Sequence, residues 1–155
     1  MNYPLGYHIT FGTYGARLPG SQKPHVDNQN NQFGAPLPRA DALRERAARE
    51  RMTQDEVRLT LEQRALVENA IRDVAERYTW FIRALAPQTN HVHAVITAAR
   101  EGQALRDALK AVASRWLNKQ FGQRQWWAEK GSVKYLYEPD YYANAIEYVK
   151  RQRDM

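Results

Sequence analysis

The chain has 155 residues, no cysteine and a net charge of +6, from 23 Lys and Arg against 17 Asp and Glu. This length predicts one domain with its own hydrophobic core, and the lack of cysteine excludes disulfides and thiolate metal sites and fits a reducing compartment. No apolar run approaches the roughly 20 residues of a membrane span, and the first residues lack a secretory pattern. We therefore expect a soluble, unprocessed cytoplasmic protein with no membrane contact.

Positive charge is concentrated in the last third of the chain. From residue 110 onward there are nine Lys or Arg and five Asp or Glu, with Trp and Tyr residues interleaved among them. Cations that contact phosphates, beside rings that stack on unpaired bases, are typical of a surface that binds nucleic acid, particularly single strands. The alternative is an ordinary charged surface over core aromatic residues.

The first third of the chain predicts one strand and a long polar segment. Residues 7–14 alternate and are rich in strand-forming types, which indicates a strand. Residues 15 to about 38 contain many Asn, Gln, Gly and Pro without a period, which indicates a loop or arm, and residues 39–52 are typical of a solvated helix. We expect a single domain, residues 1–155, with a polar loop or arm insertion at about 16–56.

A helix and a hairpin are predicted next. Thr60 and Gln63 have the spacing of a capping box, and apolar residues at helical spacing behind them predict a helix of about 60–78. Residues 80–86 indicate a second strand and residues 87–90 a tight turn. The following run, Asn90 to Ile96, indicates a third strand, so the two strands form an antiparallel hairpin.

The remaining residues complete a recognisable order of elements. Helical spacing predicts a helix of about 102–120, alternation predicts a strand at 133–137, and Pro139 suits the first turn of a helix over 140–152. The order strand, helix, strand, strand, helix, strand, helix predicts an α+β fold. We expect a ferredoxin-like four-stranded antiparallel sheet with two helices on one face and an extra C-terminal helix.

Two histidines one residue apart give the strongest chemical signal. Side chains alternate along a strand, so His91 and His93 project from one face while Val92 and its apolar neighbours point to the other. Their Cα atoms lie roughly 6.5–7 Å apart, which lets two imidazoles converge on one cation. Imidazole is the commonest metal-binding side chain near neutral pH. The alternative is a histidine pair hydrogen-bonded on a solvated sheet face.

The predicted terminal helix has two faces. Tyr142, Ile146 and Val149 have the spacing of residues that pack on the domain. Tyr148 and Gln152 are four residues apart, about 40° around the helix, so both can address one point. A phenol that can attack and an amide oxygen that can bind a cation therefore lie together. The alternative for Tyr148 is a partly buried packing role.

These features together resemble the single-tyrosine HUH transposases, and most of all the REP-associated tyrosine transposase branch. The resemblance extends through residues 7–18, 89–93, 127 with 131 and 132, and 145–152. It implies a metal-dependent single-stranded DNA endonuclease and strand transferase that acts on hairpin-bearing DNA. By this resemblance His91, His93 and Gln152 would hold Mg²⁺ or Mn²⁺, and Tyr148 would attack phosphorus to leave a 5′-phosphotyrosine and a free 3′-hydroxyl.

The resemblance also implies partners. It implies single-stranded or hairpin DNA as substrate, a nucleoid-associated location, and a homodimer in which one chain's tyrosine helix completes its partner's histidine pair. The sequence leaves open completion within one chain. We expect phosphate contacts and one stacking ring among these residues: Arg17, Lys110, Arg115, Lys130, Lys134 and Trp127. Solvated charges and a core ring are the alternatives.

Two competing functions are compatible with the same residues. A domesticated, non-catalytic protein would bind DNA hairpins without cutting them, and an unrelated metal hydrolase would use His91 and His93 with a bound water.

Gln152 lies three residues before Met155. Because helix ends fray, we expect it to be ordered only with a partner or DNA.

Overall fold

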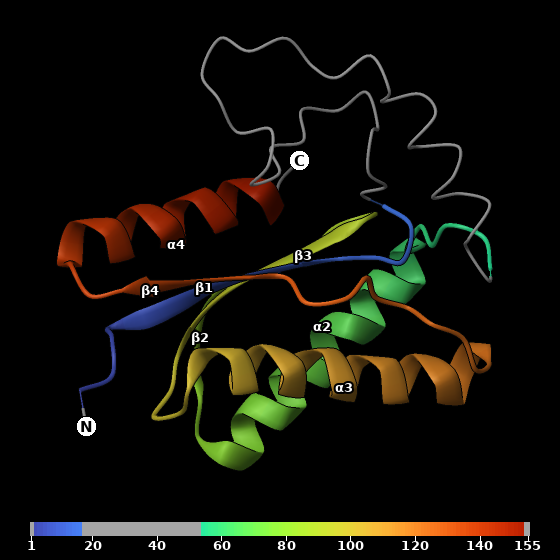
Figure 1. Ribbon diagram of the computed structural model, residues 1–155, viewed down its shortest axis with the longest axis horizontal. Helices are drawn as coiled ribbons and strands as arrows, with labels where there is room; N and C mark the ends of the chain where they lie inside the picture. Colours follow the sequence, from blue (N-terminus) through green and yellow to red (C-terminus); the bar gives the residue numbers. More distant parts are fainter. Residues whose placement is uncertain (1, 17–53, 154–155) are drawn as a thin grey trace, which may run out of the picture.

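The computed structural model describes residues 2–16 and 54–153. Most of the predicted polar insertion at about 16–56, with Arg17 and the expected helix at 39–52, lies outside the described residues. The elements are, in chain order, β1 (Gly6–Gly12), α2 (Leu61–Tyr78), β2 (Phe81–Pro87), β3 (His91–Thr97), α3 (Gly102–Phe121), β4 (Ser132–Leu136) and α4 (Pro139–Arg153) (Figure 1).

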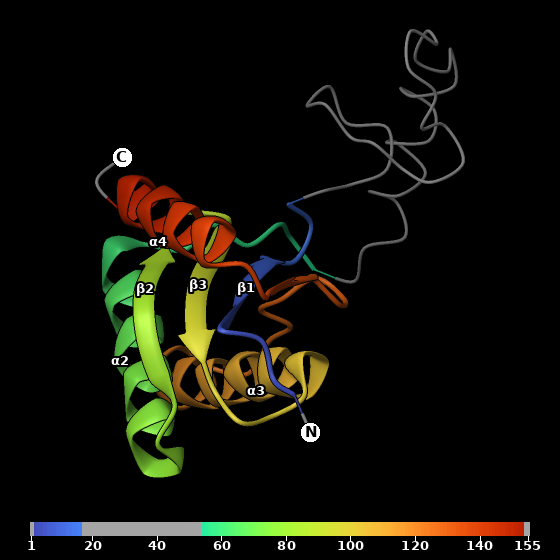
Figure 2. The same ribbon diagram turned by 90° about the vertical axis from the view of Figure 1, so that its left-hand side faces the viewer.

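The four strands form one antiparallel sheet in the order β2-β3-β1-β4. α2 and α3 cover one face of this sheet, and α4 lies on the other face, across β2 and β3 (Figures 1 and 2). The predicted ferredoxin-like α+β fold, with two helices on one face and an extra terminal helix, is therefore confirmed.

Local sequence signals explain where α2 begins and ends. The hydroxyl of Thr60 accepts a hydrogen bond from the Gln63 backbone N–H at 3.1 Å, and the Gln63 side chain accepts one from the Thr60 N–H at 2.9 Å. This is the predicted capping box, and it satisfies two donors that the helix leaves unpaired. Thr79 ends the helix in a left-handed conformation, with a φ of 58°.

Strand alternation divides the sheet into two unequal apolar layers. The larger core lies between the sheet and α2 and α3, and it includes Ile9 and Phe11 from β1 with Val92 from β3. A smaller cluster under α4 includes Val95 and Val149, with further apolar residues packed against it. Tyr142 and Ile146 are among these, so the predicted packing face of the terminal helix is confirmed.

None of the helices within residues 2–16 and 54–153 combines the length and the apolar character of a membrane-crossing segment.

Candidate active site

β3 presents the two histidines toward the side of the sheet that α4 covers. The ring centroids of His91 and His93 lie 6.3 Å apart, and their planes are nearly parallel, at 17°. Nδ1 of His91 is 2.7 Å from Oδ1 of Asn90, and Nδ1 of His93 is 3.1 Å from the hydroxyl of Thr10, its cross-strand neighbour on β1. Each ring is thus oriented through Nδ1, the usual arrangement when Nε2 binds a metal.

α4 brings Tyr148 to the same place. Its ring lies 5.8 Å from that of His93 and meets it edge-on, at 86°. Burial of Val149, the next residue, holds this turn of the helix against the sheet. Tyr148 itself is 41% exposed, so its phenol is accessible to a substrate. One chain therefore places a histidine pair and a tyrosine in one cluster.

Gln152 lies beside the turn that leads into β3. Nε2 of Gln88 donates to the backbone oxygen of Gln152 at 2.8 Å and to its side-chain oxygen at 3.4 Å. Gln88 also donates its backbone N–H to the His91 carbonyl at 2.7 Å. Gln152 is therefore placed next to the start of the histidine strand, although its hydrogen bonds reach Gln88 rather than an imidazole.

The end of α4 is fastened to the domain, contrary to the expectation that it frays. Arg153 donates to both carboxylate oxygens of Glu68 on α2, at 2.7 and 3.2 Å, and to the Leu85 carbonyl at 3.0 Å. Burial alone would raise the pKa of Glu68, but hydrogen bonds from Arg153 and Arg72 outweigh it, and the pKa is lowered. The contacts order Gln152 within a single chain, because they hold the residue that follows it.

His8 joins this cluster, although no pattern in the sequence pointed to it. It projects from β1 on the same face as Thr10, and its ring centroid lies 5.8 Å from those of both His93 and Tyr148. Burial, and next the positive charge of Lys134 across the strand pair, lower the pKa of His8 below its ordinary value. Alternation along residues 7–14 could have shown that His8 and Thr10 share a face, but only the strand order puts that face beside His93.

Two residues predicted to contact DNA serve the fold. Trp127 is 5% exposed, its ring lies edge-on to Phe11 with centroids 4.8 Å apart, and its Nε1 donates to the Lys110 carbonyl at 3.1 Å. Its ring therefore belongs to the core and offers no face for a base, which corrects the stacking prediction. Nζ of Lys110 donates to the carbonyls of Ala128 and Lys130 at 2.8 and 2.7 Å. Burial, and next Arg106, lower the pKa of Lys110.

The other predicted DNA contacts are exposed but lie in different places. Lys134, on β4, is directly opposite His8 and faces the candidate site. Lys130 is exposed in the segment before β4. Arg115 is exposed on α3, which covers the face of the sheet opposite to α4. Arg17 lies outside the described residues.

The candidate metal ligands at this site fit a cation that is bound by few protein side chains. Within the part of the chain that the structure describes, no group of three or more His, Cys, Asp or Glu side chains is placed to hold a metal ion. The candidate ligands are therefore two imidazoles and the amide oxygen of Gln152. The amide oxygen suits Mg²⁺ and Mn²⁺, whereas imidazole binds borderline divalent ions such as Fe²⁺, Ni²⁺ and Zn²⁺ more readily. A cation with few protein ligands retains positions for a substrate oxygen.

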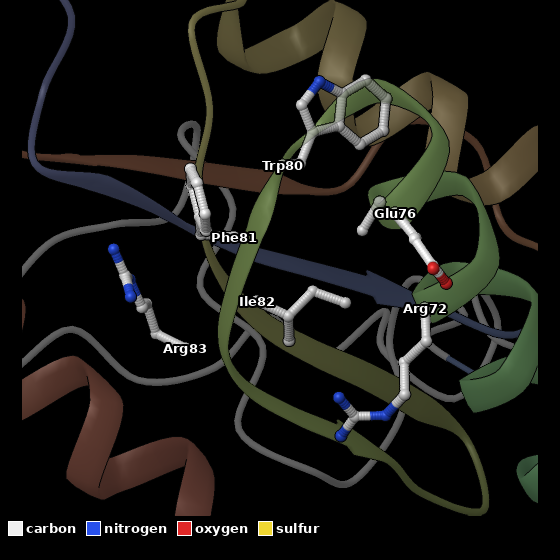
Figure 3. A pocket seen from close by; sticks show the side chains of 7 residues that line it. Arg72, Glu76, Trp80, Phe81, Ile82 and Arg83 are labelled. Atoms are coloured by element: carbon white, nitrogen blue, oxygen red, sulfur yellow. The ribbon is translucent and has the colours of Figure 1, made fainter.

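A cavity of about 280 Å³ lies elsewhere, between α2 and the first residues of β2 (Figure 3). Arg72 and Glu76 from α2 face Phe81 and Arg83 from β2 across it, and the Arg83 guanidinium lies 5.3 Å from the centre of the Phe81 ring. Phe81 pairs with Thr97, at the opposite end of β3 from the histidines. The cavity is therefore separate from the candidate active site.

Known proteins are similar to this chain in sequence and in fold. The sequence model of a family described as IS200-like transposases matches residues 47–153. Among solved structures, a REP-associated tyrosine transposase bound to a REP hairpin is similar in fold, with a TM-score of 0.57 and 12% identity. The match covers 96% of this chain but 66% of that one.

A presumed transposase from Deinococcus radiodurans R1 matches with a TM-score of 0.49 and 18% identity, over 98% of this chain and 93% of that one. No curated protein matches the sequence.

Proposed function

Since the chain belongs to the family of IS200-like transposases, we propose that it is a single-tyrosine HUH nuclease and strand transferase of the REP-associated branch. Its substrate is single-stranded DNA that carries a hairpin, in the cytoplasm at the nucleoid. The observation that carries this proposal is the contact between the Tyr148 ring and the His93 ring. A phenol beside an imidazole pair is the arrangement that such a reaction requires.

Tyr148 is the nucleophile of the proposed reaction. Its phenol oxygen forms a bond to phosphorus while the bond from phosphorus to the 3′-oxygen breaks. The products are a 5′-phosphotyrosine and a free 3′-hydroxyl, and the proton lost by the phenol is matched by the one that the 3′-oxygen gains. The covalent link conserves the bond energy, so a later 3′-hydroxyl can reverse the step without a nucleotide cofactor.

His91, His93 and Gln152 are the proposed ligands of a divalent ion, Mg²⁺ or Mn²⁺. When bound, the ion would polarise a phosphate oxygen and offset the charge that develops there. Ionising a free phenol of pKa about 10 at pH 7 costs about 4 kcal/mol, so positive charge near Tyr148 favours its attack. Asn90 and Thr10 keep the two imidazoles oriented through Nδ1.

The remaining sites and the assembly are also proposals. Lys134 lies on the site's face and is exposed, which supports it as a phosphate contact. Lys130 and Arg115 are proposed as weaker, peripheral contacts, and Arg17 as a contact from the arm of residues 16–56. A homodimer remains a proposal, but the contacts of Tyr148 support a site completed within one chain.

Covalent capture tests the function. The full chain is incubated with Mn²⁺ and 5′- or 3′-labelled stem-loop DNAs with single-stranded flanks, then run on a denaturing gel. We expect a protein-linked product with the wild type and none with Tyr148→Phe, and mass spectrometry should place the phosphate on Tyr148. Hairpin binding without an adduct would instead indicate the non-catalytic binder, and cleavage by Tyr148→Phe would indicate a metal hydrolase that uses water.

A further inference from the structure

Three rings from three elements meet at the candidate site. The centroids of His8 on β1, His93 on β3 and Tyr148 on α4 are each 5.8 Å from the other two. The Thr10 hydroxyl engages Nδ1 of His93. Of the two imidazoles beside the phenol, His93 is a proposed metal ligand, whereas His8 has no assigned role.

His8 carries a buried polar atom that lacks a partner. Its Nε2 is shielded from solvent and makes no hydrogen bond with any of the residues that the structure describes. A buried nitrogen without a partner is costly and therefore needs an explanation, of which a catalytic role is one. The groups that face the ring are Lys134 from β4, His93 from β3 and Tyr148 from α4.

Tyr148 has the complementary group. None of the hydrogen bonds among residues 2–16 and 54–153 involves its hydroxyl, which is both a donor and an acceptor. It can therefore pair with Nε2 of His8 in either tautomer of the ring. Lys134 also faces His8, but its ammonium can only donate, and it extends from an exposed edge strand.

We propose that His8 is a positioning residue for Tyr148: its Nε2 hydrogen-bonds to the phenol hydroxyl and directs the phenol oxygen toward the phosphorus that it attacks. This inference rests on the proposed function and adds to it a residue outside the histidine pair and the tyrosine helix. The two groups are not hydrogen-bonded in the structure, so the proposal requires the Tyr148 side chain to rotate about its bonds when DNA binds.

Position matters here because attack on phosphorus is sensitive to small displacements. A misplacement of about 1 Å of a reacting group can cost roughly 100-fold in rate. We expect His8→Phe, which keeps an aromatic ring in the cluster and removes both nitrogens, to slow adduct formation by about 10- to 100-fold at saturating DNA. His8→Gln, whose amide reaches close to the position of Nε2, should recover part of that loss.

Two measurements separate positioning from packing. The first is the single-turnover rate of adduct formation, with DNA affinity and Mn²⁺ affinity measured for the same variants. We expect the rate to fall in His8→Phe while both affinities stay within about twofold of the wild type. Tyr141→Phe, on an exposed turn of the same helix, is the matched control and should change none of these quantities.

The second measurement does not depend on activity. In protein labelled with ¹³Cζ-tyrosine, the Tyr148 signal is identified by its loss in Tyr148→Phe. We expect it to shift in His8→Phe and to return toward its wild-type position in His8→Gln, with stem-loop DNA bound. If His8→Phe fails to fold, as thermal unfolding would show, His8→Leu replaces it with the same expectations.

Three outcomes decide the matter. A wild-type adduct rate in His8→Phe, or a Tyr148 signal that does not respond to His8 substitution, would overturn the proposal. Equal losses in His8→Phe and His8→Gln, with unchanged Tyr148 signals, would reduce His8 to a packing residue and also overturn it. If even the wild type forms no adduct, the proposed function fails, and the Tyr148 signal still tests the contact.

Discussion

The ring of Tyr148 meets the ring of His93 edge-on, with centroids 5.8 Å apart and an angle of 86° between the planes. Tyr148 comes from the terminal helix and His93 from an inner strand, and both belong to the same chain. The helix is held on both sides of Tyr148, by Ile146 in the apolar cluster before it and by Val149 and the Arg153 contacts after it. The geometry therefore favours a site in which each chain works by itself.

A mixing experiment follows from this geometry. We expect Tyr148→Phe and His93→Ala each to be inactive in adduct formation and to stay inactive when mixed in equal amounts, because each chain lacks one half of its own site. The measurement is the labelled adduct on a denaturing gel after co-incubation, or after refolding the two variants together. Recovery of about a quarter to a half of wild-type adduct in the mixture would show instead that the tyrosine helix is exchanged between chains.

Metal binding should depend on the residue that orients His93. Thr10→Val keeps the shape of the side chain and removes the hydroxyl that contacts Nδ1 of His93 at 3.1 Å. Removing such an outer contact commonly weakens metal affinity by about 10- to 100-fold. We expect Mn²⁺ titration calorimetry to show this loss, with a larger one in His93→Ala. Thr97→Val, at the far end of β3, is the control and should bind Mn²⁺ like the wild type.

Loss of the Glu68 carboxylate should loosen the end of α4. Because the pKa of Glu68 is lowered in the folded protein, its pairing stabilises the fold above the ordinary carboxyl pKa, and that contribution is lost as the pH falls through the lowered value. Arg153 is about half exposed, so we expect a modest effect of about 0.5–1 kcal/mol for Glu68→Gln at pH 7 in urea unfolding.

The difference between Glu68→Gln and the wild type should shrink below about pH 4. Asp73→Asn, which removes an exposed ion pair within α2, is the control because it does not contact α4. If Glu68→Gln and Asp73→Asn changed protease cleavage near Gln152 equally, the contact between Glu68 and Arg153 would not be what holds the end of α4.

Tyr7 should make the fold sensitive to alkali. Burial, and next the nearby Tyr135, raise the pKa of Tyr7 to about 12, and its hydroxyl donates to the Arg100 carbonyl at 2.6 Å. A raised pKa means that the unfolded chain loses this proton first. Its stabilising contribution is therefore complete below about pH 10 and is lost between about pH 10 and 12, up to roughly 2–3 kcal/mol.

Tyr7→Phe tests this directly. We expect the variant to be about 1 kcal/mol less stable at pH 7, from the lost hydrogen bond, and to lose less stability than the wild type between pH 9 and 11.5. Urea unfolding at a series of pH values measures both. If the free energy of unfolding fell equally with pH in Tyr7→Phe and in the wild type, Tyr7 would not titrate as its burial implies. Tyr7 matters to the candidate active site because it lies next to His8 on β1, with the two side chains on opposite faces of the sheet.

Local patterns predicted the parts of the site that depend on one element at a time. The alternation of β3 placed His91 and His93 on one face, and helical spacing placed Tyr142, Ile146 and Val149 against the sheet. His8 was missed because its place in the cluster depends on which strands are neighbours. In the sheet, β1 lies beside β3 with Thr10 opposite His93, and no spacing within either segment contains that register.

Burial of aromatic and basic residues was the least predictable feature. Trp127 lies in the basic last third of the chain and was predicted to be a stacking ring, but an isolated bridge to Thr13 and an edge contact with Phe11 draw it into the core. Lys110 lies on a helix at a spacing that suits a solvated charge, yet two carbonyls of the 128–130 segment bind its ammonium. Both outcomes come from the loop between α3 and β4, whose path the sequence did not reveal.

The two lysines give opposite predictions. Lys134→Ala removes an exposed cation on the site's face, so we expect weaker binding to single-stranded DNA and a salt slope smaller by about 1, without loss of stability. Lys110→Met keeps an apolar stem and removes both hydrogen bonds to the loop, so we expect a loss of about 1–3 kcal/mol in stability. Its DNA salt slope should stay like that of the wild type.

Fluorescence anisotropy at four salt concentrations measures the salt slope of both variants, and urea unfolding of the same samples measures their stability. If Lys110→Met reduced the salt slope and Lys134→Ala did not, the strand of DNA would have to run along α3 rather than along the face that carries His8 and Tyr148.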